Sequence, residues 1–381
     1  MQVLPPTQRA LVIDGGSAGC FVKSLSTPSV THGSAVIRIE AASILPSYGA
    51  LCRGISSADS SASAPISGVA GFSAIGRIAA LGPDSARLCI GQLVYVDSVV
   101  RARDDPDCMF ISTHFGGMSE GSRRLKREVW SNGTFAEYAN MPLENCIPLD
   151  ETRLLKELAY SAEDLGYMAY QLVPYAGLLD IELRPGETLI VCPATGFYSS
   201  IGVQVAIAMG ARVIAMARDE EKLQNIRREV LRTSQHAALQ LIKITGDETA
   251  DTAALRALVP GGADAVLDMT PSSASTSTHT KSAIKALRRG GRVSLMGSTR
   301  NIGADVIMLN DIMLKGKMMY ERKTILQFVK LLEGGCFPRG PAYVTAKAFA
   351  LEDWTKAFSA AAELKGIGEC AVFMPRDLPQ N

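Results

Sequence analysis

Histidine, paired cysteines and long hydrophobic runs are the features that this 381-residue sequence has little of or lacks. Its four histidines are scattered along the chain, and its eight cysteines contain no C-x-x-C pair. Tetrahedral zinc needs three or four nitrogen, sulfur or oxygen ligands, and this spacing does not supply them. A disulfide framework is also unexpected in a chain of this length without a secretion signal. We expect free, mostly buried thiols and no bound metal.

No apolar stretch approaches the roughly 20 residues that a membrane-spanning helix requires. The longest, over 201–217, is interrupted by Gln204, Gly210 and Arg212. The first ten residues hold two prolines and no charged-then-apolar signal pattern, and the last residues hold no lipidation motif. The sequence therefore predicts a cytoplasmic protein without a membrane partner.

An excess of charge of one sign is absent too, because 39 basic residues face 38 acidic ones. A protein that binds a nucleic-acid backbone is normally far more basic, so no nucleic-acid partner is expected. Hydrophobic residues make up 47% and charged residues 20%, which is typical of a globular chain and excludes extended disorder. The length suggests two domains.

The first part of the chain has the pattern of a small β domain. Residues 34–41 alternate apolar and polar side chains, and strand-like pieces follow at 74–80 and 92–98 with Gly and Pro between them. The segment 101–131 is a charged excursion, whose basic cluster is expected to be a solvated surface. Strand character resumes over 134–139.

From about residue 155 the pattern changes to strands and helices in alternation. Continuous apolar runs such as 188–193 are typical of parallel strands that are buried on both faces. The fold class predicted is therefore α/β, with a doubly wound parallel sheet. We predict a β-rich domain over 1–155, a nucleotide-binding domain over 156–340 and a return to the first domain over 341–381. The expected strands are 188–193, 212–217, 240–244, 265–268 and 292–296, and the expected helices are 156–173, 199–210, 219–232, 250–258 and 280–288.

The turn after residue 192 is the most informative segment. A buried strand leads into Ala194-Thr195-Gly196-Phe197-Tyr198-Ser199 and then into a helix. Such a turn directs backbone N–H groups and the positive end of a helix at a pyrophosphate. The three positions of the usual G-x-G-x-x-G read Ala194, Gly196 and Ser199, so the pattern is degenerate. The alternative is that these small residues serve packing alone.

The end of the next strand indicates which dinucleotide would bind. Proteins that bind NAD place an acidic residue there for the ribose hydroxyls. Here Ala217 is followed by Arg218, and Lys222 comes one turn later. A guanidinium suits the 2′-phosphate of NADP(H), which we therefore predict as the cofactor. The alternative is that Arg218 is an ordinary surface arginine.

With these motifs in order, the chain resembles the medium-chain dehydrogenase/reductase superfamily. It is most similar to the zinc-free members of the quinone- and enoyl-reductase type or the alcohol-dehydrogenase type, and especially to their fungal forms. The resemblance covers about 34–376. Besides the 194–202 turn, it is carried by Arg38–Pro46, Gly71–Ile78, Gly133–Ala139, Leu183–Glu187 and Arg289–Gly297.

The resemblance implies a GroES-like, β-barrel-type catalytic domain, split in sequence by a Rossmann domain, with the cofactor in a cleft. It implies that Met168 lies on a helix that touches the nicotinamide, and that Gly297 and Ser298 border the nicotinamide ribose. Backbone contacts from Thr270 are expected as well. It also implies a homodimer through edge strands of the two sheets, and we place that edge strand near 303–308.

The departures from the family pattern bear on the chemistry. Zinc-dependent members carry a catalytic cysteine near the position of Pro46–Tyr48 and then a Gly-His-Glu, where this chain has Gly71-Phe72-Ser73. Their structural zinc uses four cysteines, where the 97–131 region offers Cys108 and His114. Without zinc, alcohol oxidation lacks its Lewis acid, whereas reduction of a polarised C=C needs only a hydride, a donor for the enolate and a proton.

Tyr48 is the predicted catalytic residue, since the resemblance places it near the nicotinamide and its phenol could donate to an enolate or alkoxide. Ser47 is a weaker candidate, and Tyr48 could instead only line or pack the pocket. The leading hypothesis is an NADPH-dependent, zinc-independent reductase that acts on an enone, enoyl thioester or quinone of a small organic molecule. The alternatives are a zinc-free alcohol dehydrogenase or carbonyl reductase in secondary metabolism, and an NADP-binding protein without turnover.

Overall fold

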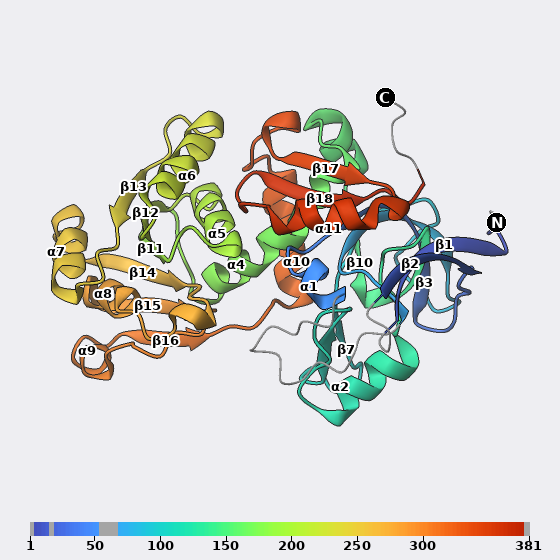
Figure 1. Ribbon diagram of the computed structural model, residues 1–381, viewed down its shortest axis with the longest axis horizontal. Helices are drawn as coiled ribbons and strands as arrows, with labels where there is room; N and C mark the ends of the chain where they lie inside the picture. Colours follow the sequence, from blue (N-terminus) through green and yellow to red (C-terminus); the bar gives the residue numbers. More distant parts are fainter. Residues whose placement is uncertain (1–3, 15–18, 53–67, 377–381) are drawn as a thin grey trace. The chain divides into compact units, whose positions relative to one another are not determined.

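The computed structural model describes residues 4–14, 19–52 and 68–376, which form two compact units (Figure 1). Unit 1 comprises residues up to Ala169 together with 339–364 and 369 onward, and unit 2 comprises 170–338 and 365–368. The chain passes from the first to the second within the helix α4 (Met168–Asp180). The corresponding boundaries expected from the sequence lie at 155/156 and 340/341.

Unit 1 is built on a seven-stranded sheet in the order β10-β6-β5-β3-β18-β17, with β9 also paired to β3. The central strand β3 is buried along nearly all of its length, and residues of the C-terminal segment complete the sheet through β18. Its strands are β3 (Ser34–Ser43), β5 (Ala74–Leu81), β6 (Leu93–Val96), β9 (Tyr138–Pro142), β10 (Cys146–Pro148), β17 (Thr345–Phe349) and β18 (Glu369–Phe373).

Two smaller sheets and several short helices complete unit 1. The order β2-β1-β4 forms one sheet, and β7 pairs with β8 in a hairpin. The strands are β1 (Thr7–Asp14), β2 (Gly19–Ser26), β4 (Gly68–Val69), β7 (Val99–Arg101) and β8 (Met109–Ile111). The helical pieces are α1 (Tyr48–Cys52), α2 (Glu120–Arg124), η1 (Leu125–Val129), η2 (Leu143–Asn145), η3 (Thr152–Glu157), α3 (Ala162–Leu165), η5 (Gly340–Ala342), η6 (Leu351–Asp353) and α11 (Trp354–Ala362).

Unit 2 is the predicted doubly wound sheet, with six parallel strands in the order β13-β12-β11-β14-β15-β16. The β11 strand is buried at all five positions, as its continuous apolar run predicts. The strands are β11 (Thr188–Cys192), β12 (Arg212–Ala217), β13 (Leu239–Lys243), β14 (Ala263–Asp268), β15 (Leu287–Leu295) and β16 (Met313–Gly316).

The helices of unit 2 alternate with these strands. Right-handed crossovers that run in opposite directions along a sheet place their helices on opposite faces. Accordingly α5 and α6 lie together near β12, whereas α7 and α8 pack on each other and α8 contacts β11, β14 and β15 (Figure 1). The helices are α5 (Phe197–Ala208), α6 (Glu220–Thr233), η4 (Ser272–Ala274), α7 (Glu248–Leu258), α8 (His279–Lys285), α9 (Ala304–Leu309) and α10 (Arg322–Glu333).

Three sequence predictions of local structure are wrong. The segment 156–173 is not one helix, because η3, α3 and α4 share it and α4 continues past Pro174 to Asp180. The segment 303–308 is not a strand, because Ala304–Leu309 is helical and the sheet edge is β16. The strand expected over 134–139 begins only at Tyr138. A short apolar stretch such as 303–308 fits either a helix or a strand, and tertiary packing decided between them.

No helix in the described segments is both long enough and apolar enough to cross a bilayer.

Candidate functional site

The carboxyl ends of four neighbouring strands of unit 2 meet at one edge of its sheet. The strands β12, β11, β14 and β15 end at Ala217, Cys192, Asp268 and Leu295. The strand order reverses between β11 and β14, since the chain runs from β11 toward β13 on one side and from β14 toward β16 on the other. Ligands of doubly wound sheets bind at this kind of switch point. We call this row of strand ends and the turns that follow it the strand-end edge.

The turn from β11 into α5 is the first part of the strand-end edge. Ala194 is buried, and its N–H donates to the carbonyl of Met216 at 2.7 Å, which fixes the turn against β12. Gly196 is the N-cap of α5 and is exposed, with no side chain capping the helix. By contrast, Asp219 caps α6 through the N–H of Lys222 at 3.0 Å. The first N–H groups of α5 are thus left for an external acceptor, as a bound phosphate requires.

The residues around the first turn of α5 differ in burial and in the polar groups of their side chains. Thr195 is half-buried, as are Phe197 and Tyr198, whose rings pack edge to face at 5.1 Å. Ser199 is buried, and a Cβ placed on Gly196 would lie 3.1 Å from its Oγ. Burial raises the pKa of the Tyr198 phenol, so this group stays protonated in the physiological range.

The end of β12 carries cationic groups. Ala217 is buried, and Arg218 directly after it is exposed. Lys222 is exposed one turn into α6, and its Nζ lies 3.7 Å from Oδ2 of Asp219. Asp219 is the nearest carboxylate along the chain, and it is engaged as the cap of α6. The uncapped N-terminus of α5 suits the pyrophosphate of a dinucleotide, and the exposed arginine after the neighbouring strand suits an anionic group.

The β14 and β15 ends close the other side of the edge. The N–H of Ser298, which is exposed, donates to the carbonyl of Thr270 at 2.7 Å. Gly297 lies so close to the backbone of Thr270 and Met269 that a Cβ there would overlap both. A glycine is therefore required where these two strand ends approach, and it leaves the backbone of 297–298 accessible at the edge.

The sequence did not predict a buried polar network that Thr270 forms with Asp268, His279 and Thr280. The Thr270 hydroxyl donates to Oδ1 of Asp268 at 2.5 Å and lies 2.8 Å from Nε2 of His279, and the Thr280 hydroxyl also donates to Oδ1 at 2.8 Å. Burial raises the pKa of Asp268. Burial also lowers the pKa of His279, the charge of Arg218 lowers it further, and the charge of Asp268 opposes this shift. The side chain of Thr270 thus holds the strand end in place, and its backbone faces the edge.

The signal for this network was present but weak. Asp268 ends an apolar strand, so its carboxylate had to be buried and to find donors. One donor, Thr270, lies two residues away in sequence, and the other, Thr280, lies at the start of α8, whose position next to β14 follows from the helix packing and not from sequence spacing.

Tyr48, the predicted catalytic residue, lies in an aromatic cluster of unit 1. It is fully buried, its ring stacks on Phe358 with centroids 5.8 Å apart, and it lies 5.0 Å from Phe135. Ser47 is half-buried, and its carbonyl accepts the N–H of Leu51 at 3.0 Å. This placement agrees with packing as one function of the Tyr48 ring, and its catalytic role stays a prediction.

The predicted site residues therefore fall into two groups. Unit 2 brings the 194–199 turn together with Arg218, Lys222, Thr270 and Gly297–Ser298 along the strand-end edge. Ser47, Tyr48 and Met168 belong to unit 1, where Met168 is fully buried as the first residue of α4.

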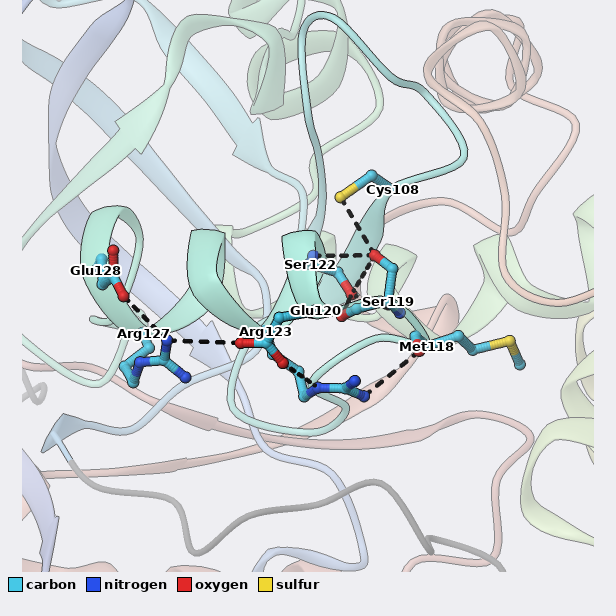
Figure 2. A network of polar contacts seen from close by, with 8 residues as sticks. All are labelled: Cys108, Met118, Ser119, Glu120, Ser122, Arg123, Arg127 and Glu128. Carbon is cyan, nitrogen blue, oxygen red and sulfur yellow. Dashed lines mark hydrogen bonds and ion pairs between the residues drawn. The ribbon is translucent and has the colours of Figure 1, made fainter.

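The positions of the family's metal ligands hold groups with other partners. Phe72 is buried, and Oγ of Ser73 accepts a hydrogen bond from the Tyr95 hydroxyl at 3.1 Å. The thiol of Cys108 accepts from the hydroxyl of Ser119 at 3.6 Å, and Ser119 caps α2 in a capping box with Ser122 (Figure 2). Among the residues that the structure describes, no three His, Cys, Asp or Glu side chains gather as metal ligands would.

Comparison with known families matches both parts of the chain. Residues 31–151 match the alcohol dehydrogenase GroES-like domain, and residues 199–334 match the domain described as zinc-binding dehydrogenase. The chain belongs to the medium-chain dehydrogenase/reductase superfamily. This is a family of nicotinamide-dependent oxidoreductases, and its GroES-like and Rossmann domains are the fold that the sequence predicts.

Individual relatives are distant. The chain is 27% identical to the acryloyl-coenzyme A reductase of Metallosphaera sedula over 214 residues, which are 56% of this chain and 60% of that protein. It is 31% identical to YfmJ of Bacillus subtilis, named as an NADP-dependent oxidoreductase, over 40% of this chain and 42% of that protein. The structure of the alcohol dehydrogenase TADH from Thermus sp. ATN1 is similar with a TM-score of 0.72 at 20% identity, covering 97% of this chain and 100% of that one.

Proposed function

We propose that the protein is an NADPH-dependent, zinc-independent oxidoreductase that reduces an activated C=C of a small organic molecule. The observation that carries the cofactor assignment is the end of β12, where buried Ala217 is followed by exposed Arg218 beside the uncapped N-terminus of α5. The first carboxylate after this strand end, that of Asp219, caps α6 and is therefore not a free acceptor for a ribose hydroxyl. The NADP-dependent name of the Bacillus subtilis relative agrees with this assignment.

Zinc independence rests on the donor set. The matched domain is described as zinc-binding, yet this chain has Pro46–Tyr48 and Gly71-Phe72-Ser73 where zinc-dependent members have ligands. A phenyl ring and hydroxyl groups are not a zinc site, which needs thiolate, imidazole or carboxylate donors. The Lewis acid that alcohol oxidation uses is therefore missing from these positions, and C=C reduction is the chemistry that needs it least.

The reaction divides between cofactor and protein. NADPH supplies a hydride for the β-carbon of a double bond conjugated to a carbonyl. The 194–199 turn and Arg218 hold the dinucleotide, and the backbone of 297–298 borders it. The carbonyl oxygen gains negative charge as the β-carbon accepts hydride, so a donor must stabilise it. We assign that donor role to the hydroxyl of Tyr48, with Ser47 as the second candidate. A proton from a side chain or from water is then added at the α-carbon.

Calorimetric titration of metal-stripped protein with NADPH and with NADH tests the cofactor assignment. We expect a strong preference for NADPH, which Arg218→Ala weakens by roughly ten- to a hundredfold, since a charge-assisted hydrogen bond contributes about 1.5–3 kcal/mol. NADH binding should hardly change. Arg227→Ala, an exposed arginine on the outer part of α6, is the matched control. An NADPH affinity that survives Arg218→Ala contradicts the assignment.

A substrate panel then separates the candidate activities. Consumption of NADPH with enones, enoyl thioesters or quinones, and saturated products, supports C=C reduction. Formation of alcohols from ketones or aldehydes supports the zinc-free carbonyl reductase. This alternative is kept because the fold is similar to that of a solved alcohol dehydrogenase. NADPH binding without turnover on any compound would leave a cofactor-binding protein. A place in secondary metabolism stays a prediction.

We further propose a homodimer that forms through the β16 edge of the unit 2 sheet. This strand pairs only with β15 among the described strands, so its outer side has unpaired backbone groups. Met308 and Leu309 on α9 and Met313 on β16 are exposed by 68%, 64% and 44%. Apolar side chains beside an open strand edge favour a second copy as partner. Light scattering should give a dimer, and Met313→Lys should shift it toward monomer.

A further inference from the structure

A second group of basic side chains lies in unit 1, outside the strand-end edge. It consists of the imidazole of His114, in the turn after β8, and the amine of Lys126, in η1. We propose that His114 and Lys126 form a subsite that binds a small anionic group, a carboxylate or a phosphate, on the substrate. The identification of that group as part of the substrate rests on the proposed reductase function.

The turn that holds His114 is fixed by unusual backbone geometry. Thr113 has φ +55°, a left-handed conformation that residues other than glycine rarely adopt. Its hydroxyl donates to the carbonyl of Gly71, and the N–H of His114 donates to the carbonyl of Ile111 at 3.1 Å. The isolated bridge between Ile111 and Phe115 closes the turn. A strained residue that is held by a specific hydrogen bond is a feature of sites where one side chain must be aimed.

The imidazole of His114 has an unmet hydrogen bond. The side chain is half-buried, and its Nδ1 is shielded from solvent without a hydrogen-bond partner. Leaving a buried polar atom without a partner is costly, and each such atom in a folded protein calls for an explanation. A ligand that accepts from Nδ1 would supply the missing bond.

Lys126 stands out from the cations beside it. Arg123 pairs with Glu120, and Arg127 pairs with Glu120 and Glu128, on the exposed side of α2 and η1 (Figure 2). Lys126 is half-buried in the same segment, and it forms no ion pair or hydrogen bond with any described residue. Lysine is almost never buried without a partner, because removing its ammonium from water costs free energy that an anion normally offsets.

The two basic groups affect each other. Burial lowers the pKa of His114, and the charge of Lys126 lowers it further, while burial also lowers the pKa of Lys126. Lys126 is the charged group that acts on His114, and no carboxylate of the described residues compensates the pair. An anion near both would favour their protonated forms and relieve the repulsion, whereas a cation or an apolar group would not.

The subsite lies along the segment that also supports Tyr48. Gly71, which accepts from Thr113, follows Ala70, whose carbonyl accepts the N–H of Phe135 at 2.8 Å. The ring of Phe135 in turn packs against that of Tyr48. One segment thus connects the proposed anion subsite to the predicted catalytic tyrosine within unit 1. A substrate anchored by its anionic end would be positioned relative to the unit that carries Tyr48.

Nuclear magnetic resonance of the histidine rings tests the subsite without cofactor or turnover. The chain has only four histidines, and loss of one signal in His114→Gln identifies that ring. The probes are but-2-enoate and inorganic phosphate, each titrated at constant ionic strength. We expect either anion to raise the His114 pKa by about one unit, which corresponds to roughly tenfold tighter binding to the protonated ring. An unchanged His114 pKa with both anions overturns the proposal.

Two variants of one segment decide the role of Lys126. In Lys126→Met the response of His114 to the anions should be lost, because the ammonium that shares the anion is gone. Arg124→Met, an exposed cation two residues away, should leave the response unchanged. A response that persists in Lys126→Met, or that is lost equally in Arg124→Met, overturns the paired subsite. Circular dichroism confirms that both variants fold.

Kinetics distinguishes failure of the subsite from failure of the proposed function. With NADPH, we expect Lys126→Met to raise KM for an anionic enoyl substrate by roughly tenfold, with kcat nearly unchanged, and to leave KM for neutral cyclohex-2-enone unaltered. Equal losses for both substrates contradict the subsite. Anion binding by His114 without reduction of any substrate refutes the reductase, and reduction of cyclohex-2-enone without anion binding refutes only the subsite.

Discussion

The strand-end edge of unit 2 and the aromatic cluster of unit 1 show two ways of building a candidate site. Backbone groups make the edge: the uncapped N-terminus of α5, the glycine at 297 that lets two strand ends approach closely, and the Thr270 carbonyl that accepts the N–H of Ser298. The cluster is made by side chains, with Tyr48 packed among Phe135, Phe358 and their neighbour Phe373. A backbone site depends on local geometry, whereas a packed site depends on residues that are far apart in sequence.

Removing a ring from the cluster should have the largest effect on stability. Phe135 is completely buried and contacts three other rings, so Phe135→Ala should lower the free energy of unfolding by about 3–5 kcal/mol. Denaturant unfolding measures this. If the two regions are independent, the folded fraction should bind NADPH as the parent protein does. A loss of NADPH affinity in the folded fraction of Phe135→Ala would show that the aromatic cluster and the strand-end edge are not independent.

Removing only the phenolic oxygen from the cluster separates packing from chemistry. Tyr48→Phe keeps the ring and should change stability by at most about 1.5 kcal/mol. If the hydroxyl stabilises the enolate, kcat should fall on the order of a hundredfold, since one such donor contributes about that much. Stopped-flow measurement of NADPH oxidation gives kcat. An unchanged kcat would leave Tyr48 as a packing residue and move the assignment to Ser47.

Adding one carbon to the edge tests its dependence on backbone. Gly297→Ala would force Cβ against the backbone of Thr270, so we expect a loss of about 1–3 kcal/mol in stability and weaker NADPH binding. Gly261→Ala, in the turn before β14, is the control, because nothing lies within 4 Å of a Cβ there. Calorimetry and thermal unfolding measure both. Equal behaviour of the two variants would contradict the requirement for glycine at 297.

The smallest expected effect concerns pH and the network below the edge. The pKa of His279 is lowered in the folded protein, so its neutral form is favoured there. Its contribution to stability is full above the unfolded pKa of about 6.5 and is lost as pH falls through the lower folded pKa. As pH falls from 7.5 to 5.5, the parent should lose more stability than His279→Gln, as denaturant unfolding at each pH would measure. An identical pH dependence in parent and variant would exclude this titration.

Regular elements of unit 2 were the most predictable part of the fold. The strands over 188–193 and 212–217 are continuous apolar runs of the right length, and the structure places β11 and β12 there. The helical state of 303–308 was not predictable, because a short apolar stretch fits helix and strand alike, and the division of 156–173 into η3, α3 and α4 was not predicted either. Of the site, the 194–199 turn was readable since its elements are adjacent in sequence.

The amino-acid sequence by itself determined the alternation of strands and helices from β11 to β15, the turn at Gly196 without a capping side chain and the cation at Arg218, because these are properties of neighbouring residues. Tertiary structure alone decided that Thr280 donates to Asp268, that His279 lies against the Thr270 hydroxyl, that Tyr48 packs against Phe358, and that the charge of Lys126 lowers the pKa of His114. Each of these contacts joins residues that only the packing of strands and helices brings near. The cost of burying their polar atoms appears only once that packing exists.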